Sequence, residues 1–213
     1  MTTPRFSAGA DIAPIQADQL DLAGVALARG FHDDPLAIYM IPDADERARL
    51  LPTHFSAFLR LGCVSGEVYT TRGEPEGAAV WFPPHNAESE AERAGGEETR
   101  TEDPALGLPP DAFERFMTVT SALEPLHDEA VPASHYYLAL LGVDRDLHGQ
   151  GVGSRLLRPM LARADAEGIY CYLETYNPAN VPFYRKHGFE VVVEDIEPSS
   201  GVHFWTFRRA PRQ

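Results

Sequence analysis

The hydrophobic and polar positions along the chain follow two different periods. Segments with apolar residues three or four positions apart predict helices, and short apolar or alternating runs predict strands. The predicted helices span 18–31, 47–61, 110–128, 154–167 and 182–186. The predicted strands span 12–15, 66–71, 77–82, 136–143, 169–175, 190–195 and 202–208. Elements in this order are typical of an α/β layer with a mixed sheet.

Prolines and glycines set the expected ends of the helices. Gly30 interrupts the first helical pattern, and Pro35 prevents an easy continuation. Pro125 is expected to end the helix over 110–128. Pro159 lies inside the next helix and should bend it by removing one hydrogen bond. Gly168 is expected to close that helix as a C-terminal glycine.

A glycine-rich loop follows the predicted strand 136–143. After a polar turn, Gly149, Gly151 and Gly153 alternate with other residues. Glycines leave backbone N–H groups uncovered, and at a helix N-terminus such groups form an anion site, for which a pyrophosphate is the simplest ligand. The segment lacks the lysine of a P-loop before Ser154, and its spacing is not that of a dinucleotide-binding turn. The alternative is a β-to-α turn with no ligand.

The segment 86–103 differs in composition from the rest. It holds seven acidic residues and no large apolar residue. This composition predicts a mobile acidic loop, either a solvated insertion or a flap over a binding site. The chain of 213 residues is long enough for one full core, so we expect a single domain over 1–213.

Composition and charge restrict the function classes. The net charge of −14 argues against nucleic-acid binding and is compatible with a cationic amine substrate. No apolar run is long enough to span a membrane, and the N-terminus lacks a signal pattern, so we expect cytoplasmic residence. The alanine- and arginine-rich composition is typical of a GC-rich bacterial gene. Cys63 and Cys171 are expected to be buried thiols, with a disulfide as the alternative.

Several motifs in the C-terminal half together resemble those of the GNAT acetyltransferases. They are His148–Gly153, Tyr172–Thr175, Asn177–Tyr184 and His187–Phe189. The pattern is most similar to that of the puromycin N-acetyltransferase-like small-molecule enzymes. The resemblance implies a mixed, mostly antiparallel sheet with one parallel, splayed strand pair, flanked by helices. His148 departs from the pattern, because the family usually has Gln or Arg there.

The resemblance implies acetyl-CoA as the acetyl donor and places it on the glycine loop and the strand before it. The implied cofactor-binding residues are Leu141, Gly142, Val143, His148, Gly149, Gln150, Gly151, Val152, Gly153, Ser154 and Asn180. In this arrangement the backbone of the strand binds the pantetheine arm and the acetyl oxygen.

Two residues are candidates for proton transfer. The resemblance places the Tyr184 hydroxyl near the cofactor sulfur, as the general acid for the departing thiolate. The alternative is a core tyrosine. Glu174 ends an apolar strand, where burial would raise its pKa and suit it to receive the amine proton. The alternative for Glu174 is a structural carboxylate.

The candidates for the acceptor pocket are spread over the chain: Phe31, Asp34, Tyr39, Trp81 and Tyr176. Asp34 could instead only cap the helix that follows it, Trp81 could be core, and Tyr176 could be exposed. We expect no metal site, because the histidine at position 32 has no partner at ligand spacing.

These features predict an enzyme that transfers an acetyl group from acetyl-CoA to a primary amine of a small molecule, directly within a ternary complex. One alternative is an acetyltransferase of protein lysines or N-termini. Another is a non-catalytic acyl-CoA-binding module. The expected partner is a small-molecule amine, with neither nucleic acid nor membrane, and a homodimer is possible.

Overall fold

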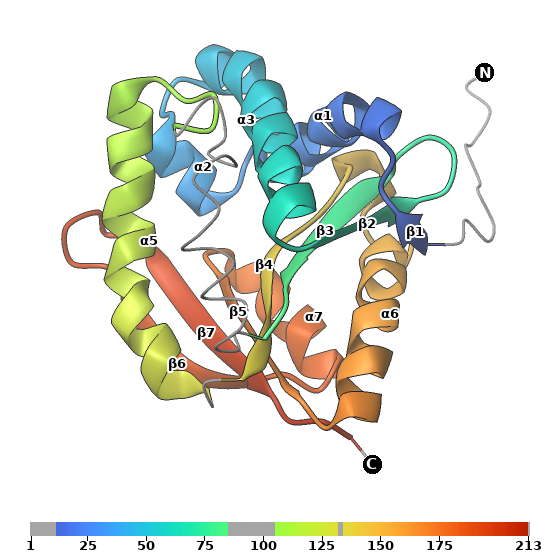
Figure 1. Ribbon diagram of the computed structural model, residues 1–213. Helices are drawn as coiled ribbons and strands as arrows, with labels where there is room; N and C mark the ends of the chain where they lie inside the picture. The colour runs from blue at the N-terminus through green and yellow to red at the C-terminus, as the bar shows by residue number, and fades with distance from the viewer. Residues whose placement is uncertain (1–11, 85–104, 132–133, 213) are drawn as a thin grey trace, which may run out of the picture.

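The computed structural model describes residues 12–84, 105–131 and 134–212. One seven-stranded sheet runs through these residues in the order β1-β2-β3-β4-β5-β7-β6 (Figure 1). All neighbours are antiparallel except β4 and β5. The strands are β1 (Ile12–Pro14), β2 (Glu67–Thr71), β3 (Gly77–Phe82), β4 (His135–Val143), β5 (Tyr170–Thr175), β6 (Glu190–Ile196) and β7 (His203–Arg209). The predicted mixed sheet with one parallel pair is therefore confirmed. The acidic segment 86–103 lies outside the described residues.

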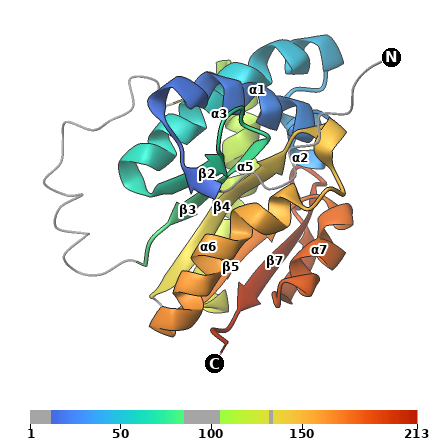
Figure 2. The ribbon, with the colours of Figure 1, turned by 90° about the vertical axis from the view of Figure 1, so that its right-hand side faces the viewer.

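Helices cover both faces of the sheet. They are α1 (Leu20–Phe31), α2 (Pro35–Met40), α3 (Ala44–Ser65), α5 (Pro110–Ala130), α6 (Val152–Glu167) and α7 (Val181–Lys186). Helices α6 and α7 pack on one face, and α1, α2, α3 and α5 on the other (Figures 1 and 2). Because each face has its own apolar core, the central strands are buried from both sides.

Strand β3 shows how the strand period divides these two cores. Ala78 and Val80 face the α1–α3 core, while Ala79 and Trp81 face the α6 core. Successive side chains of a strand point to opposite faces, so this alternation follows from the apolar sequence itself. Trp81 has no exposed surface and is a core residue.

Two expectations about boundaries and burial were wrong. Helix α5 continues through Pro125 to Ala130, because Leu123 and Ala130 are buried on either side of the proline and hold both turns in place. Gly30 lies inside α1, which ends at Phe31 as predicted, and a Cβ on Gly30 would overlap the Val143 carbonyl. Cys63 is a free but exposed thiol on α3, since it lies on the solvent side of that helix.

Other expectations are confirmed. Cys171 is a free, buried thiol, and Gly168 ends α6 with a left-handed backbone at φ +71°. Asp34 caps α2, its carboxylate accepting from the Leu36 N–H at 3.0 Å. Pro159 lies inside α6, as predicted.

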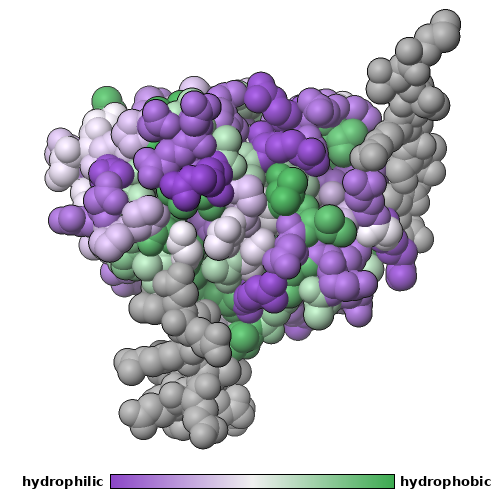
Figure 3. Space-filling view, turned by 90° about the horizontal axis from the view of Figure 1, so that it is seen from above, coloured by the Kyte–Doolittle hydropathy of each residue, from purple (hydrophilic) through white to green (hydrophobic). Residues whose placement is uncertain are grey.

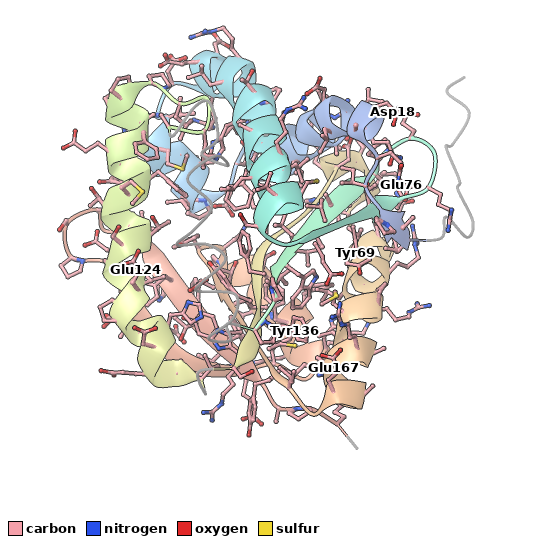
Figure 4. The ribbon with its side chains drawn as sticks, viewed as in Figure 1. Asp18, Tyr69, Glu76, Glu124, Tyr136 and Glu167 are labelled. Carbon is pink, nitrogen blue, oxygen red and sulfur yellow. The ribbon has the colours of Figure 1, made fainter. Side chains whose placement is uncertain are left out.

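A hydrogen-bonded cluster joins α6 to β2 and β4 (Figure 4). The Tyr136 hydroxyl donates to Glu167 at 2.6 Å, and Arg163 pairs with both Glu167 and Glu67. The Tyr69 hydroxyl donates to Glu67 at 2.6 Å. These bonds fix the position of α6 on the sheet, and α6 carries the glycine loop at its N-terminus.

The face of the molecule seen from above is mostly polar (Figure 3). In the view from above, hydrophilic residues dominate the face, with apolar residues scattered between them (Figure 3). Within the described ranges, no helix combines the length and apolarity needed to cross a bilayer.

Candidate active site

Strands β4 and β5 are paired over only part of their length. Their parallel register holds three pairs, from His135↔Tyr170 to Tyr137↔Tyr172. Beyond Tyr137, β4 stays paired with β3 but not with β5. An irregularity in the β3–β4 register leaves Ala139 without a partner, which is the pattern of a β-bulge and bends the strand. The two strands therefore separate toward their carboxyl ends.

The glycine loop lies at the open end of this separation. Gly149 and Gly151 adopt left-handed backbone angles, φ +75° and +78°, and a Cβ on either would meet nothing within 4 Å. Gly151 is the N-cap of α6, so the uncovered N–H groups of the first turn face open space. Gly153 differs, because a Cβ there would lie 3.2 Å from Phe183. This is the geometry that a helix N-terminal anion site requires.

A cavity of about 420 Å³ extends from the loop along the freed part of β4. Its walls include ten of the eleven predicted cofactor residues: Leu141, Gly142, Val143, His148, Gly149, Gly151, Val152, Gly153, Ser154 and Asn180. Gln150 is not among the lining residues. Its side-chain amide instead donates to the Asp146 carbonyl at 3.1 Å.

The His148 ring holds the loop against β4. Its Nε2 lies 3.0 Å from the Val143 carbonyl oxygen. This contact fixes the position of the loop relative to β4. Lys186 of α7 also lines the cavity and was missed from the sequence. The sequence did offer one signal for Lys186, because it is the only lysine in a chain of net charge −14.

A second cavity of about 310 Å³ lies between the separated strands and the helices α1, α2, α3 and α5. Its walls are mostly aromatic and aliphatic, and include Phe31, Phe55, Phe58, Phe82, Phe116, Tyr137, Leu138, Leu140 and Tyr176. Of the predicted acceptor residues, Phe31, Asp34 and Tyr176 lie in these walls. Tyr39 does not line this cavity, and Trp81 is buried on the opposite face of the sheet.

Five residues line both cavities: Phe31, Asp34, Leu141, Asn180 and Tyr184. They come from α1, the α2 cap, β4, the turn before α7, and α7. Side chains from these distant segments therefore form a junction where a molecule in one cavity meets a molecule in the other.

Tyr184 is both a core residue and a junction residue. Only 5% of its surface is exposed, and its ring packs against Phe189 and Phe207. Burial raises the pKa of its hydroxyl well above the ordinary value, and the Asp34 carboxylate raises it further. The hydroxyl is therefore protonated at neutral pH and available as a donor.

Two largely buried carboxyl groups line the second cavity. Burial raises the pKa of Glu174 to about 7, although the Tyr137 and Tyr172 hydroxyls oppose this. Burial likewise raises the pKa of Asp34 to about 6, against the lowering effect of the Leu36 and Ala37 N–H groups. Both groups can thus exchange protons near neutral pH. The sequence indicated such a shift for Glu174 only.

His54 is a further polar wall residue that the sequence did not single out. Its Nδ1 lies 3.0 Å from the Leu106 carbonyl oxygen, and burial lowers its pKa. It is therefore a neutral ring at physiological pH. Within the part of the chain that the structure describes, no group of three or more His, Cys, Asp or Glu residues is arranged to hold a metal ion.

Comparison with known proteins identifies this arrangement. Residues 119–189, which contain the parallel strand pair, the glycine loop and Tyr184, match the model of the acetyltransferase (GNAT) family. The whole fold is similar to a Corynebacterium glutamicum structure described as histone acetyltransferase HPA2 and related acetyltransferase, with a TM-score of 0.64 and 20% identity over 95% of this chain and 97% of that one. The chain therefore has the GNAT fold, and its residues 119–189 match the GNAT acetyltransferase family.

Two sequence relatives of this chain are named as N-acetyltransferases. An uncharacterized N-acetyltransferase of Schizosaccharomyces pombe is 23% identical over 82% of this chain and 72% of its own length. The N-alpha-acetyltransferase RimI of Mycobacterium tuberculosis is 38% identical over 80 residues, which are 37% of this chain and 51% of RimI. A mosquito arylalkylamine N-acetyltransferase-like structure shares the fold, with a TM-score of 0.55 at 15% identity over 93% of this chain and 98% of that one.

Proposed function

We propose that this GNAT enzyme transfers the acetyl group of acetyl-CoA directly to a primary amine of a small molecule, with both substrates bound together. The observation that supports direct transfer is the junction: two separate cavities share Tyr184, Asp34 and three other wall residues. A donor in one cavity and an acceptor in the other would be in contact, so no acyl-enzyme intermediate is needed.

The donor would lie in the cavity of the glycine loop. The α6 N-terminus would bind its diphosphate, and the Lys186 ammonium would add a positive charge to the same wall. Leu141, Gly142 and Val143 would offer main-chain groups along the part of β4 that has left β5. A backbone N–H aimed at the developing oxyanion contributes roughly 3 kcal/mol to a transition state.

Glu174 would receive the proton of the acceptor. A free alkyl amine has a pKa of about 10 and enters mostly as an ammonium ion, so it must lose a proton before it attacks. A carboxyl group with a pKa of about 7 is a far better base at neutral pH than an exposed glutamate. Asp34, at the junction, would attract the same cation.

Tyr184 would protonate the departing thiolate. Its hydroxyl is held at the junction, keeps its proton at neutral pH, and belongs to the wall that both cavities share. A thiol has a pKa of about 8.5, so modest assistance is sufficient for it to leave.

Structures with the same fold support a small amine as acceptor. They are described as agmatine, arylalkylamine and polyamine N-acetyltransferases. An aromatic cavity of about 310 Å³ with two carboxyl groups suits an apolar amine. The likeness to RimI favours a second candidate, the N-terminal amine of a protein.

Two measurements test the proposal. Acetyl-CoA at millimolar concentration should raise the melting temperature, because a ligand that binds only the folded state stabilises it, whereas NAD and ATP should not. A thiol-release assay should then be run with phenethylamine, agmatine, spermidine and a basic peptide carrying a free N-terminus. Release with a small amine but not with the peptide is the expected result. No shift with acetyl-CoA would refute acetyl-CoA binding, and release with the peptide alone would favour the second candidate.

A further inference from the structure

A row of polar side chains leads from the acceptor cavity to the surface, along the contact of α5 with the sheet. Glu174 Oε1 lies 3.9 Å from Nδ1 of His127, and Nε2 of His127 lies 2.7 Å from Nε2 of His135. The exposed fraction rises from 10% for the Glu174 side chain to 22% for that of His127. His135 is partly exposed at the start of β4, and Ser134 beside it is exposed.

Aromatic rings hold His127 in this orientation. Its ring stacks on Tyr172 at a centroid distance of 4.0 Å and an angle of 15°, and Tyr137 lies 4.9 Å away. Both tyrosines come from the paired part of β4 and β5. The His127 ring is thus fixed with one nitrogen toward Glu174 and the other toward His135.

The 2.7 Å contact between two imidazole nitrogens restricts where protons can be. One nitrogen must carry a proton and the other a lone pair, because two N–H groups would repel at this distance. The pair can therefore hold one excess proton at a time but not two. The contact is also too short for a metal ion between the rings, since each metal–nitrogen bond needs about 2.0–2.1 Å.

The surroundings favour transient protonation of this pair. His127 lies in the last turn of α5, where the helix dipole stabilises a positive charge. Among the described residues, the titratable groups that contact the His127 ring, besides His135, include Glu174 and Tyr172 on β5 and Tyr137 on β4. Arg208 of β7 binds the Ala130 carbonyl at the end of α5 and lies over the Tyr170 ring.

We propose that His127 and His135 form a proton relay that carries the acceptor's proton from Glu174 to the solvent. This rests on the proposed function, in which an ammonium and acetyl-CoA give an amide, a free thiol and one proton. That proton passes from Glu174 to Nδ1 of His127 through one bridging water, which their separation of 3.9 Å requires. The Nε2 proton of His127 then passes to His135, and His135 releases its Nδ1 proton to water. Exchange with water on the partly exposed rings restores the starting tautomers.

The first test needs no substrate. In a pH titration followed by NMR of the imidazole Cε1–H signals, the two rings should titrate in two steps at least about one pH unit apart, because they share a proton. In His135→Gln, His127 should titrate in a single, shifted step. Independent titrations that the substitution does not move would overturn the shared proton.

The second test measures the relay in catalysis. With phenethylamine as acceptor, His135→Gln should lower kcat about tenfold in dilute buffer, leave KM unchanged, and recover when imidazole is added to accept the proton. His203→Gln is the matched control, because His203 also pairs with a glutamate, at 3.5 Å, and packs on an aromatic ring, but lines neither cavity. It should change neither parameter.

The outcomes separate the two proposals. If the wild type acetylates no amine, the proposed function fails while the titration still decides whether the pair shares a proton. If the wild type is active and His135→Gln keeps its kcat in dilute buffer, the relay is refuted. A loss of kcat that imidazole does not restore would also refute it, because that is the result for a purely structural pair.

Discussion

At the scale of single residues, burial determines the chemistry of this site. Tyr184, Glu174 and Asp34 are polar groups enclosed by apolar walls, and in each case loss of water raises the pKa. The tyrosine keeps its proton, and the two carboxyl groups titrate near neutrality. One physical cause thus produces both a donor and proton acceptors.

Tyr184→Phe removes the hydroxyl but keeps the ring that packs on Phe189 and Phe207. We expect kcat to fall about 100-fold, a typical contribution of a general acid, with the Kd of acetyl-CoA and the melting temperature unchanged. Steady-state kinetics and calorimetric titration measure these quantities. Tyr136→Phe is the control, since its hydroxyl donates to Glu167 on the α6 side of the sheet. An unchanged kcat in Tyr184→Phe would remove the acid role.

Asp34→Asn should stabilise the protein at neutral pH but not at acid pH. Asp34 has a folded-state pKa of about 6 against an ordinary value of 3.8, so ionising it opposes folding. The wild type therefore loses stability as the pH rises from about 4 to about 6, whereas asparagine never ionises and still caps α2. With about 1.4 kcal/mol per pKa unit, the gain above pH 7 should be about 3 kcal/mol. Urea unfolding at pH 4 and pH 8 measures it, and an equal difference at both would contradict the buried charge.

Some residues of this site could be predicted from the sequence, and the properties of others could not. Tyr184 and Glu174 stand in a recognisable pattern of spacings, so their places could be predicted. Asp34 at the junction and His54 in the wall acquire their properties from helices far apart in the chain. Burial of that kind depends on tertiary packing, which periodicity within one segment does not report.

At the scale of elements, the turn from β4 into α6 determines the geometry of the proposed cofactor site. Its two left-handed glycines place the start of α6 against open space, and the His148 ring holds the turn to β4. The order of strand, glycine turn and helix was predictable, because all of its signals are local. The continuation of α5 through Pro125 was not, because it depends on burial of residues on both sides.

Gly151→Val should abolish acetyl-CoA binding, since a branched side chain would occupy the space that the diphosphate needs. Valine at φ +78° also costs about 1–2 kcal/mol in backbone strain. Gly73→Val is a matched control: Gly73 has φ +80° and equally open surroundings, but it lies in the β2–β3 turn. Both variants should lose similar stability, and only Gly151→Val should lose affinity by about 100-fold or more in calorimetric titration. Equal affinities would show that the loop is not the site.

At the scale of the whole molecule, two apolar cores on opposite faces of one sheet fix the position of the site. The fold class was predictable because the alternation of elements and the resemblance agreed. The proposed acceptor cavity was not predictable, because α1, α2, α3 and α5 build it together from segments without a motif. The net charge of −14 is the remaining property of the molecule as a whole.

That charge should make the two substrates respond to salt in opposite ways. An acidic protein attracts a cationic amine and repels an anionic donor, and salt screens both effects over about 10 Å at 0.1 M. We therefore expect kcat/KM for agmatine to fall with rising ionic strength, and kcat/KM for acetyl-CoA to rise or stay constant. Initial rates in a sodium chloride series at fixed pH test this. A parallel decline for both substrates would contradict electrostatic steering of the amine.

The three-pair register between β4 and β5 has a mechanical consequence. The β4–β5 pairing that joins strands β1–β4 to strands β5–β7 is only three residue pairs long, and the proposed substrates would bridge the gap beyond it. With substrates bound, the two parts of the sheet should twist less relative to each other than in the unliganded protein. Amide exchange from Leu138 to Val143 should then be slower than in the unliganded protein. Substrate would in this way complete a sheet that the chain itself leaves partly open.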